Sequence, residues 1–343
     1  MKNNIMREKP FEFLRDRNGE KFSEETVKNW YKSRAYVLEN LSKTQKDVVV
    51  DGDSPLMLAV VRHIALFAHY ISNNPTVITL VSQNKNIEEE LKKEEYLCHL
   101  VDYLKQPGCD LDLKLQIVDT IPADFQGITM TEKDVEDFVA KKNPEEVYSI
   151  DTRKAVLAGK IYELGALIDN LPAEDIHSTK RYAMALEAYE YDLLSEEDIQ
   201  QLINKDQWEK NPIKVKNGVS SIYSADCFEF RAFAMKGYKK KDYKIWEQNN
   251  EALSISEHAR WVVERLIMGY RPINRNERMQ YEELFGEKRQ DYFKKLKNNP
   301  HDLVHIDICS YRDLRRIDPN SLKYDSFLML AIPRILNKLK DNA

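Results

Sequence analysis

Three short runs rich in β-branched residues, separated by stretches of helical periodicity, constrain this chain most strongly. The runs occupy residues 47–50, 76–81 and 113–118. Apolar side chains recur at helical spacing over residues 56–70 after the first run and over residues 87–104 after the second. Strands that alternate with helices form parallel sheets with right-handed crossovers. We therefore predict an α/β fold with a parallel sheet and flanking helices.

The predicted α/β unit extends beyond these three strands. Residues 146–150 are interpreted as a fourth strand, and residues 152–168 as the next helix. A Rossmann-like domain is therefore predicted for residues 47–205. It is preceded by a helical lead-in, residues 1–46, in which Ser23 marks the start of a helix. At 343 residues the chain exceeds the usual size of a single core, which favours two domains.

Composition and charge restrict the class of function. Hydrophobic residues make up 42% of the chain, which is enough for folded cores. The formal net charge is −5, and this argues against a general nucleic-acid binder. A cluster of lysines is a local exception, and such a run is typical of a solvated surface. Its members are Lys239, Lys240, Lys241 and Lys244.

Export, membrane and metal signals are not seen in the sequence. The cysteines are scattered, without a Cys-x-x-Cys pair, at Cys98, Cys109, Cys227 and Cys309. Residues 1–9 lack the apolar core of a signal peptide, and the longest apolar stretch, residues 55–71, is interrupted by Arg62 and His63. We expect a cytoplasmic protein with no membrane segment and no bound metal.

The turn after the first predicted strand is a candidate anion site. Gly52, Asp53 and Ser54 would lie at the carboxyl end of a strand, where the start of the following helix favours anions. A dinucleotide fingerprint requires three glycines and only Gly52 is present, while Asp51 and Asp53 would repel a pyrophosphate. The alternative is structural: Gly52 permits the turn, Ser54 caps the helix and Pro55 begins it.

A strong helical pattern begins at residue 251 and opens the last part of the chain. Residues 206–250, which precede it, give few structural signals and are interpreted as a connector. Within the helix, the residues from Glu257 to Glu264 have the sequence E-H-x-R-W-x-x-E, and Gly-Tyr-Arg follows at residues 269–271. This is the most specific pattern in the chain.

The pattern resembles the helix of the ryanodine-receptor-type (RyR) repeat, in which a glycine and an aromatic residue follow an E-H-x-R-W-x-x-E segment. Residues 301–304, 311–314 and 324–325 resemble the second half of that repeat. The resemblance covers about a quarter of the chain. It implies a small, mainly helical RyR domain, which we place at residues 251–338.

For function, the resemblance implies a binding or interaction module, with nucleotides as the suggested ligands, and it implies no catalysis. RyR domains occur singly in bacterial and phage proteins, some of them behind a Rossmann-like domain similar to the regulatory modules of potassium channels (TrkA-N/RCK-like). The two domains predicted here look like that arrangement, with a degenerate Rossmann-like part because the glycines are missing.

Side chains of the RyR-like segment have the chemistry that nucleotide binding requires. The indole of Trp261 can stack on a planar base, and Tyr270 can supply a second wall. Arginine guanidinium groups can donate paired hydrogen bonds to phosphate. The candidate ligand-binding residues are Arg260, Trp261, Glu264, Arg265, Tyr270, Arg271 and His301, together with Gly52, Asp53 and Ser54.

A structural interpretation of the same helix stays open. In that case the indole belongs to the core, and Glu257 and Glu264 pair with Arg260 or Arg265 within the helix. His258 then bonds a neighbouring backbone carbonyl. Both interpretations use the same residues, so the spacing alone does not separate them.

Three functions fit these features. The first is a non-enzymatic protein that binds or senses a nucleotide or a nucleotide-derived signal, with bacterial signalling or antiviral defence as the setting that the family implies. The second is an interaction scaffold or homo-oligomer, which exposed aromatics at Tyr223, Phe228 and Tyr270 would favour. The third is a metal-dependent nucleotide-processing enzyme that uses Asp51 and Asp53.

Acid–base chemistry has one further candidate in the sequence. Asp302 or Asp307 can orient His301 or His305 as in a catalytic dyad. No nucleophile is signalled beside them, because the chain has no Gly-x-Ser-x-Gly, no P-loop and no His-Glu-x-x-His. We therefore assign no catalytic residue.

Overall fold

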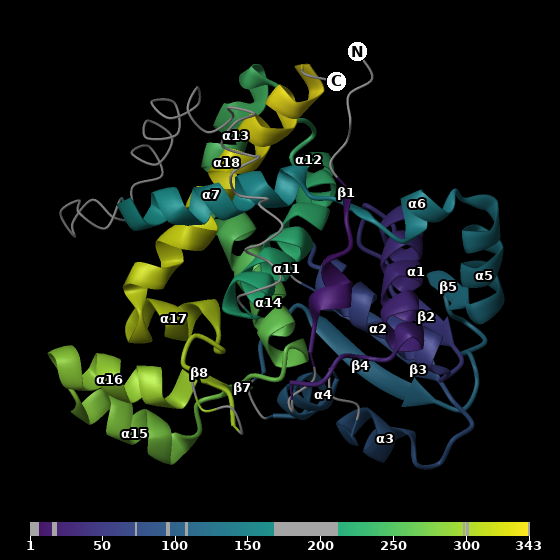
Figure 1. Ribbon diagram of the computed structural model, residues 1–343, viewed down its shortest axis with the longest axis horizontal. Helices are drawn as coiled ribbons and strands as arrows, with labels where there is room; N and C mark the ends of the chain where they lie inside the picture. The colour runs from purple at the N-terminus through teal and green to yellow at the C-terminus, as the bar shows by residue number, and fades with distance from the viewer. Residues whose placement is uncertain are drawn as a thin grey trace.

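The fold combines a sheet-containing part with a helical part (Figure 1). The sheet lies beside helices from the first half of the chain, and helices from the second half occupy the other side of the molecule. A computed structural model describes residues 7–15, 19–72, 74–93, 97–106, 109–167, 212–297, 299 and 302–341.

A four-stranded parallel sheet confirms the predicted α/β class. The strands are arranged in the order β4-β3-β2-β5, and each neighbouring pair is parallel. The apolar side chains of β2 are fully buried, which is why this strand is a continuous run of valines. The strands are β2 (Val48–Asp51), β3 (Thr76–Val81), β4 (Leu113–Val118) and β5 (Ile128–Thr131).

Helices on this side of the molecule begin largely where the sequence places them. Ser23 caps the first helix, as predicted, by accepting a hydrogen bond from the backbone of Thr26. The predicted helix over residues 87–104 is divided into two short helices. The elements are α1 (Glu24–Asn40), α2 (Pro55–Phe67), α3 (Ile87–Lys93), α4 (Cys98–Leu104) and α5 (Glu132–Lys141).

The prediction of a fourth strand at residues 146–150 is wrong. Asn143 caps a short helix there, α6 (Pro144–Val147), and proline occupies its first position. Only β6 (Ile150–Asp151) is extended, and it pairs antiparallel with β1 (Arg7–Glu8) in a separate ladder. The fourth strand of the main sheet is β5 instead.

Residues 212–250, predicted as part of a connector, form helices within the body of the protein. Phe228 and Trp246 from this stretch are fully buried. The elements here are α11 (Pro212–Asp226), α12 (Phe228–Ala234), η5 (Lys240–Asp242) and α13 (Tyr243–Gln248). Before them, η1 (Pro10–Phe13) lies near the N-terminus, and α7 (Arg153–Leu167) occupies most of the predicted helix over residues 152–168.

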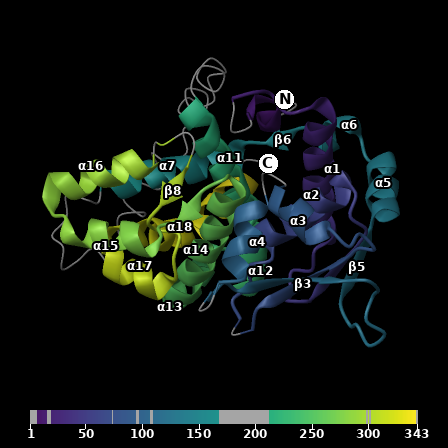
Figure 2. The same cartoon turned by 90° about the horizontal axis from the view of Figure 1, so that it is seen from below.

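The last part of the chain is mainly helical. Its two short strands are parallel, with Arg271 opposite Val304. Helices α15 and α16 lie at the far side of the molecule from α5 in both views (Figures 1 and 2). The elements are α14 (Asn250–Ile267), β7 (Arg271–Pro272), α15 (Arg275–Glu283), α16 (Gly286–Lys297), β8 (Val304–His305), α17 (Tyr311–Ile317), η6 (Pro319–Ser321) and α18 (Leu322–Asp341).

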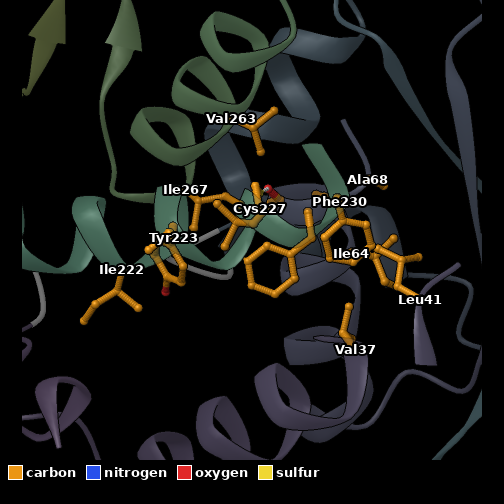
Figure 3. Close-up of a cluster of buried hydrophobic side chains, with 14 of the residues drawn as sticks. Val37, Leu41, Ile64, Ala68, Ile222, Tyr223, Cys227, Phe230, Val263 and Ile267 are labelled. Carbon is orange, nitrogen blue, oxygen red and sulfur yellow. Dashed lines mark hydrogen bonds between the residues drawn. The ribbon is translucent and has the colours of Figure 1, made fainter. Parts of the chain in front are cut away.

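One hydrophobic core joins the two parts. Val37 from α1, Ile64 from α2, Tyr223 from α11 and Val263 from α14 belong to the same buried cluster (Figure 3). Burial of these side chains stabilises both parts together, because each covers apolar surface of the other. None of the helices in the described part combines the length and the apolar character needed to cross a membrane.

Candidate functional site: an aromatic and cationic cluster around His305

The Gly52 turn has the geometry of the structural alternative. Gly52 has a φ of 117°, a conformation that favours glycine. The hydroxyl of Ser54 accepts a hydrogen bond of 3.4 Å from the backbone N–H of Met57 and so caps α2. The carboxylate of Asp53 accepts a hydrogen bond from the hydroxyl of Ser82. These contacts account for Gly52, Asp53 and Ser54 without a ligand.

This turn and the contact with α14 lie at opposite ends of the sheet. Arg231 and Ser256 both donate hydrogen bonds to the carbonyl oxygen of His69, the latter at 3.0 Å. His69 precedes β3 and therefore lies at the amino end of the strands, whereas Gly52 follows β2 at the carboxyl end. The contacts of α14 with the sheet part thus do not bring the RyR-like motif to the Gly52 turn.

The acidic and basic residues of the α14 motif form a buried network. Arg260 donates to Glu257 Oε1 from Nε at 2.8 Å and to Glu264 Oε2 from Nη1 at 2.7 Å. All three side chains are 0% exposed. Ser224 donates to Glu257 at 3.0 Å, and Arg231 Nη2 lies 3.8 Å from its Oε2. The structure thus places the candidate residues Arg260 and Glu264 inside the core, where they bind each other.

His258 also has structural contacts. Its Nε2 donates to the carbonyl oxygen of Cys309 at 3.0 Å, and its Nδ1 lies 3.4 Å from Asp325 Oδ2. Burial lowers the pKa of His258, but the hydrogen bond and charge of Asp325 outweigh it, so that the pKa is raised above its ordinary value. The pair therefore connects α14 to α18.

Arg271 is held between two carboxylates. Its Nη1 and Nη2 donate to Glu277 at 2.8 and 2.7 Å, and its Nε donates to Asp302 Oδ1 at 2.7 Å. The hydrogen bonds that Arg271 donates to Glu277 and Asp302 raise its pKa. This cation is therefore already neutralised where a phosphate would bind. The remaining candidate, His301, lies outside the described residues.

Trp261 and Tyr270, by contrast, converge on one side chain. The ring of His305 on β8 is surrounded edge to face by Trp261 at 5.0 Å, Phe293 at 5.4 Å and Tyr270 at 6.0 Å between centroids. Trp261 is partly exposed, whereas His305 and Tyr270 are buried. Three separate elements, α14, α16 and β8, together with the segment after α14, build this aromatic cluster.

Two cations border the aromatic cluster. The guanidinium of Arg265 lies 5.2 Å from the Trp261 ring centroid and 5.8 Å from that of Tyr270. Its Nη2 lies 3.5 Å from Glu264 Oε1, and its buried Nε has no hydrogen-bond partner. Lys297 Nζ lies 5.6 Å from the Phe293 centroid. Desolvation and the nearby charge of Arg265 lower the pKa of Lys297.

His305 and Asp307 are both poor charge carriers near neutral pH. Burial, followed by the charges of Lys297 and Arg265, holds the pKa of His305 well below its ordinary value. Burial and the charge of Asp318 raise the pKa of Asp307 to about 7. The backbone N–H of Asp307 donates to His305 Nδ1 at 3.3 Å, so the proton of the neutral ring is on Nε2.

In the candidate His305–Asp307 dyad the imidazole is therefore neutral, and the carboxyl group is only about half ionised near pH 7. Nδ1 of His305 lies 3.8 Å from Asp307 Oδ2, beyond hydrogen-bonding distance. One oxygen of Asp307, Oδ1, is buried without a partner, and Oδ2 accepts from Ser321 at 3.3 Å. No group of three His, Cys, Asp or Glu side chains within the described ranges is arranged to hold a metal. Within the described ranges the cluster thus offers a partly exposed indole beside the cations Arg265 and Lys297.

Phe293, Lys297, His305 and Asp307 are absent from the candidate ligand set given by sequence. Phe293 and Lys297 are four residues apart on a helix, which is a weak sign of a shared face. The alternation in residues 304–308 gives a sign that His305 and Asp307 share a face of a strand. Neither sign indicates that the two faces meet.

Comparison with known proteins gives no relative. No family model matches this chain, and no curated protein and no solved structure is significantly similar to it. The resemblance to the RyR repeat thus rests on the motif residues.

Proposed function

We propose that this protein is a non-enzymatic, cytoplasmic binding protein or sensor for a nucleotide or nucleotide-derived signal, and that the ligand binds at the aromatic cluster around His305. The observation that carries the proposal is the position of the partly exposed Trp261 beside Arg265 and Lys297. An indole stacks on a base, and nearby cations bind phosphate.

The charge balance of the cluster supports an anionic ligand. Arg265 shares Glu264 with Arg260, so it is only partly neutralised. No carboxylate in the described ranges lies within ion-pair distance of Lys297. With His305 neutral and Asp307 near its pKa, two positive charges face few negative ones.

The finer fold assignment belongs to the same proposal. Numbered along the chain, the four strands of the sheet have the order 3-2-1-4, which matches the first four strands of the Rossmann order 3-2-1-4-5-6. The E-H-x-R-W-x-x-E motif on α14 resembles the RyR repeat, which implies a nucleotide ligand. We propose a Rossmann-like part followed by an RyR domain, in a bacterial signalling or antiviral setting.

A thermal-shift screen against mononucleotides, dinucleotides, ADP-ribose compounds and cyclic nucleotides tests the proposal. A ligand at 100 times its Kd stabilises the native state by about 2.7 kcal/mol and raises the midpoint. Trp261→Ala and Arg265→Ala should abolish the shift, and Trp261→Phe should retain part of it. The control Arg312→Ala, exposed on α17, should behave like the native chain. A screen without hits, or binding that survives Trp261→Ala, would contradict the proposal.

A second candidate is the interaction scaffold or homo-oligomer. The three aromatics expected to favour it, Tyr223, Phe228 and Tyr270, are buried. A different observation supports it: Phe285, in the turn between α15 and α16, is 76% exposed, and Met279, in the middle of α15, is 53% exposed. Sedimentation velocity distinguishes it, since self-association should disappear in Phe285→Ser.

A further inference from the structure

The loop between α12 and α13 concentrates positive charge. We define the lysine loop as residues 236–244, in which five lysines and one aspartate give a net charge of +4 in a chain of net charge −5. All five lysines are exposed. They are the predicted cluster Lys239, Lys240, Lys241 and Lys244, joined by Lys236.

The lysine loop is held in one conformation. The buried Trp246 donates from its indole N–H to the carbonyl of Gly237 at 2.9 Å, which closes the loop. The backbone N–H of Lys239 donates to Asp242 Oδ2 at 2.9 Å. A Cβ on Gly237, whose φ is 144°, would lie 2.5 Å from that same carboxylate oxygen. The loop therefore presents its lysines with little backbone entropy left to lose.

Among the described residues, no carboxylate forms an ion pair with a lysine side chain of the loop. Elsewhere, exposed lysines form ion pairs, such as Lys28 with Glu24 at 2.6 Å and Lys105 with Glu88 at 2.8 Å. No such pair involves the five lysines of the loop within the described ranges. The one acid of the loop, Asp242, binds backbone instead. The positive charge thus remains available to an external anion.

Two exposed apolar side chains flank the lysine loop. Phe233, in the last turn of α12, is 52% exposed, and Ile245, in the first turn of α13, is 38% exposed. The bond between Trp246 and Gly237 draws these two turns together. Exposed apolar side chains next to unpaired cations match the two components of peripheral membrane binding, which are insertion and attraction to anionic lipid.

We propose that the lysine loop, with Phe233 and Ile245, docks the protein on an anionic lipid surface. Lysine suits this partner because a headgroup layer requires positive charge without fixed geometry. Nucleic acid is less well matched, since the loop carries no arginine and the chain is acidic. Helices α12 and α13 lie at the upper end in Figure 1, away from α15 and α16. The proposal is independent of the nucleotide site.

Co-sedimentation of the full-length chain with vesicles tests the proposal. We expect binding to vesicles of phosphatidylcholine with phosphatidylserine, none to phosphatidylcholine alone, and weakening by salt. Replacing three of the lysines, Lys239→Ala, Lys240→Ala and Lys241→Ala, should lower the partition coefficient about 100-fold, because each lysine contributes about fivefold. Phe233→Ser should lower it roughly tenfold, because an apolar contact is lost.

A triple variant on α16 provides a matched control. Lys288→Ala, Lys294→Ala and Lys295→Ala change the net charge by the same amount at exposed positions outside the loop. This control should partition as the native chain does. Equal loss in both triple variants, equal binding to both vesicle types, or no vesicle binding would overturn the proposal. So would loop-dependent binding to RNA or to an acidic protein without any binding to vesicles.

Discussion

Two stripes of residues on α14, displaced from each other by one position, have opposite environments. The inner stripe, Glu257, Arg260 and Glu264, is completely buried and its charges bind one another. The outer stripe, His258, Trp261 and Arg265, meets the His305 cluster. One residue along a helix is a rotation of about 100°.

The two stripes differ in how far carboxylates neutralise their arginine side chains. In the inner stripe the guanidinium of Arg260 is bound by two carboxylates, so removing one member leaves a buried charge without its partner. In the outer stripe the guanidinium of Arg265 lies over aromatic rings and keeps a nitrogen without a partner. We therefore expect changes in the inner stripe to alter stability and changes at Trp261 and Arg265 of the outer stripe to alter binding.

The largest effect is expected for Arg260→Met. Two buried carboxylates lose their common partner, so the free energy of unfolding should fall by about 3–5 kcal/mol. Urea unfolding followed by circular dichroism measures it. Adding Glu257→Gln and Glu264→Gln to the same chain should recover only part of the loss, because Arg231 and Arg265 then lose the carboxylates beside them. A single variant within about 1 kcal/mol of the native chain would mean that the inner stripe is not a coupled network.

A smaller, pH-dependent effect on the free energy of unfolding is expected for Asp307→Asn, in the cluster that the outer stripe contacts. The pKa of Asp307 is about 7 in the native protein and about 4 in an unfolded chain. The native state thus retains a proton that the unfolded state releases, and this stabilisation is full below pH 4 and is lost by about pH 7. The free energy of unfolding of Asp307→Asn should therefore rise relative to the native chain across this window, by at most about 4 kcal/mol.

Thermal or urea unfolding at several pH values measures the Asp307 effect. The exposed Asp291→Asn on α16 serves as the control, because its side chain lies outside the cluster. A constant difference between Asp307→Asn and the native chain from pH 4 to 8 would show that Asp307 titrates normally. The carboxylate of Asp307 would then be ionised at neutral pH, and the outer stripe would not be short of negative charge.

The smallest effect is expected for Arg271→Ala. Its ion pairs with Glu277 and Asp302 are partly exposed, and such pairs contribute about 1 kcal/mol or less. The variant should lose about that amount of stability and retain any nucleotide binding, because both carboxylates occupy the guanidinium. Calorimetric unfolding and the thermal-shift screen measure the two properties. Loss of binding with unchanged stability would place Arg271 in the site after all.

Local chemistry made part of this fold predictable. The valines of β2, the cap at Ser54 and the proline after it are signals that act within a few residues. The fourth strand was missed because β5 is a short run, Ile128–Thr131, and the apolar residues 146–150 resemble a strand more closely. At residues 144–147 the cap at Asn143 and the proline that follows it stabilise a short helix instead.

The binding cluster was only half predictable for a similar reason. Trp261 and Tyr270 belong to a specific motif, and the structure brings them together. Phe293 and His305 come from other elements, and the sequence patterns of those elements do not indicate that they pack against the motif. The inner stripe shows the same limit, since two partners of Glu257 from outside the motif, Ser224 and Arg231, lie in the stretch that is interpreted from sequence as a connector.

The carbonyl oxygen of His69 makes residue 250 a poor place to cut the chain. A fragment that begins there keeps Ser256 but loses both His69 and Arg231, so the hydroxyl of Ser256 loses its carbonyl acceptor and Glu257 loses one guanidinium beside it. Its Ile267, buried in the cluster that includes residues N-terminal to the cut, would become more exposed to water. The motif on α14 therefore packs against residues from outside the predicted domain. Transfer of this domain into another protein would require new side chains to cover the apolar surface of α14.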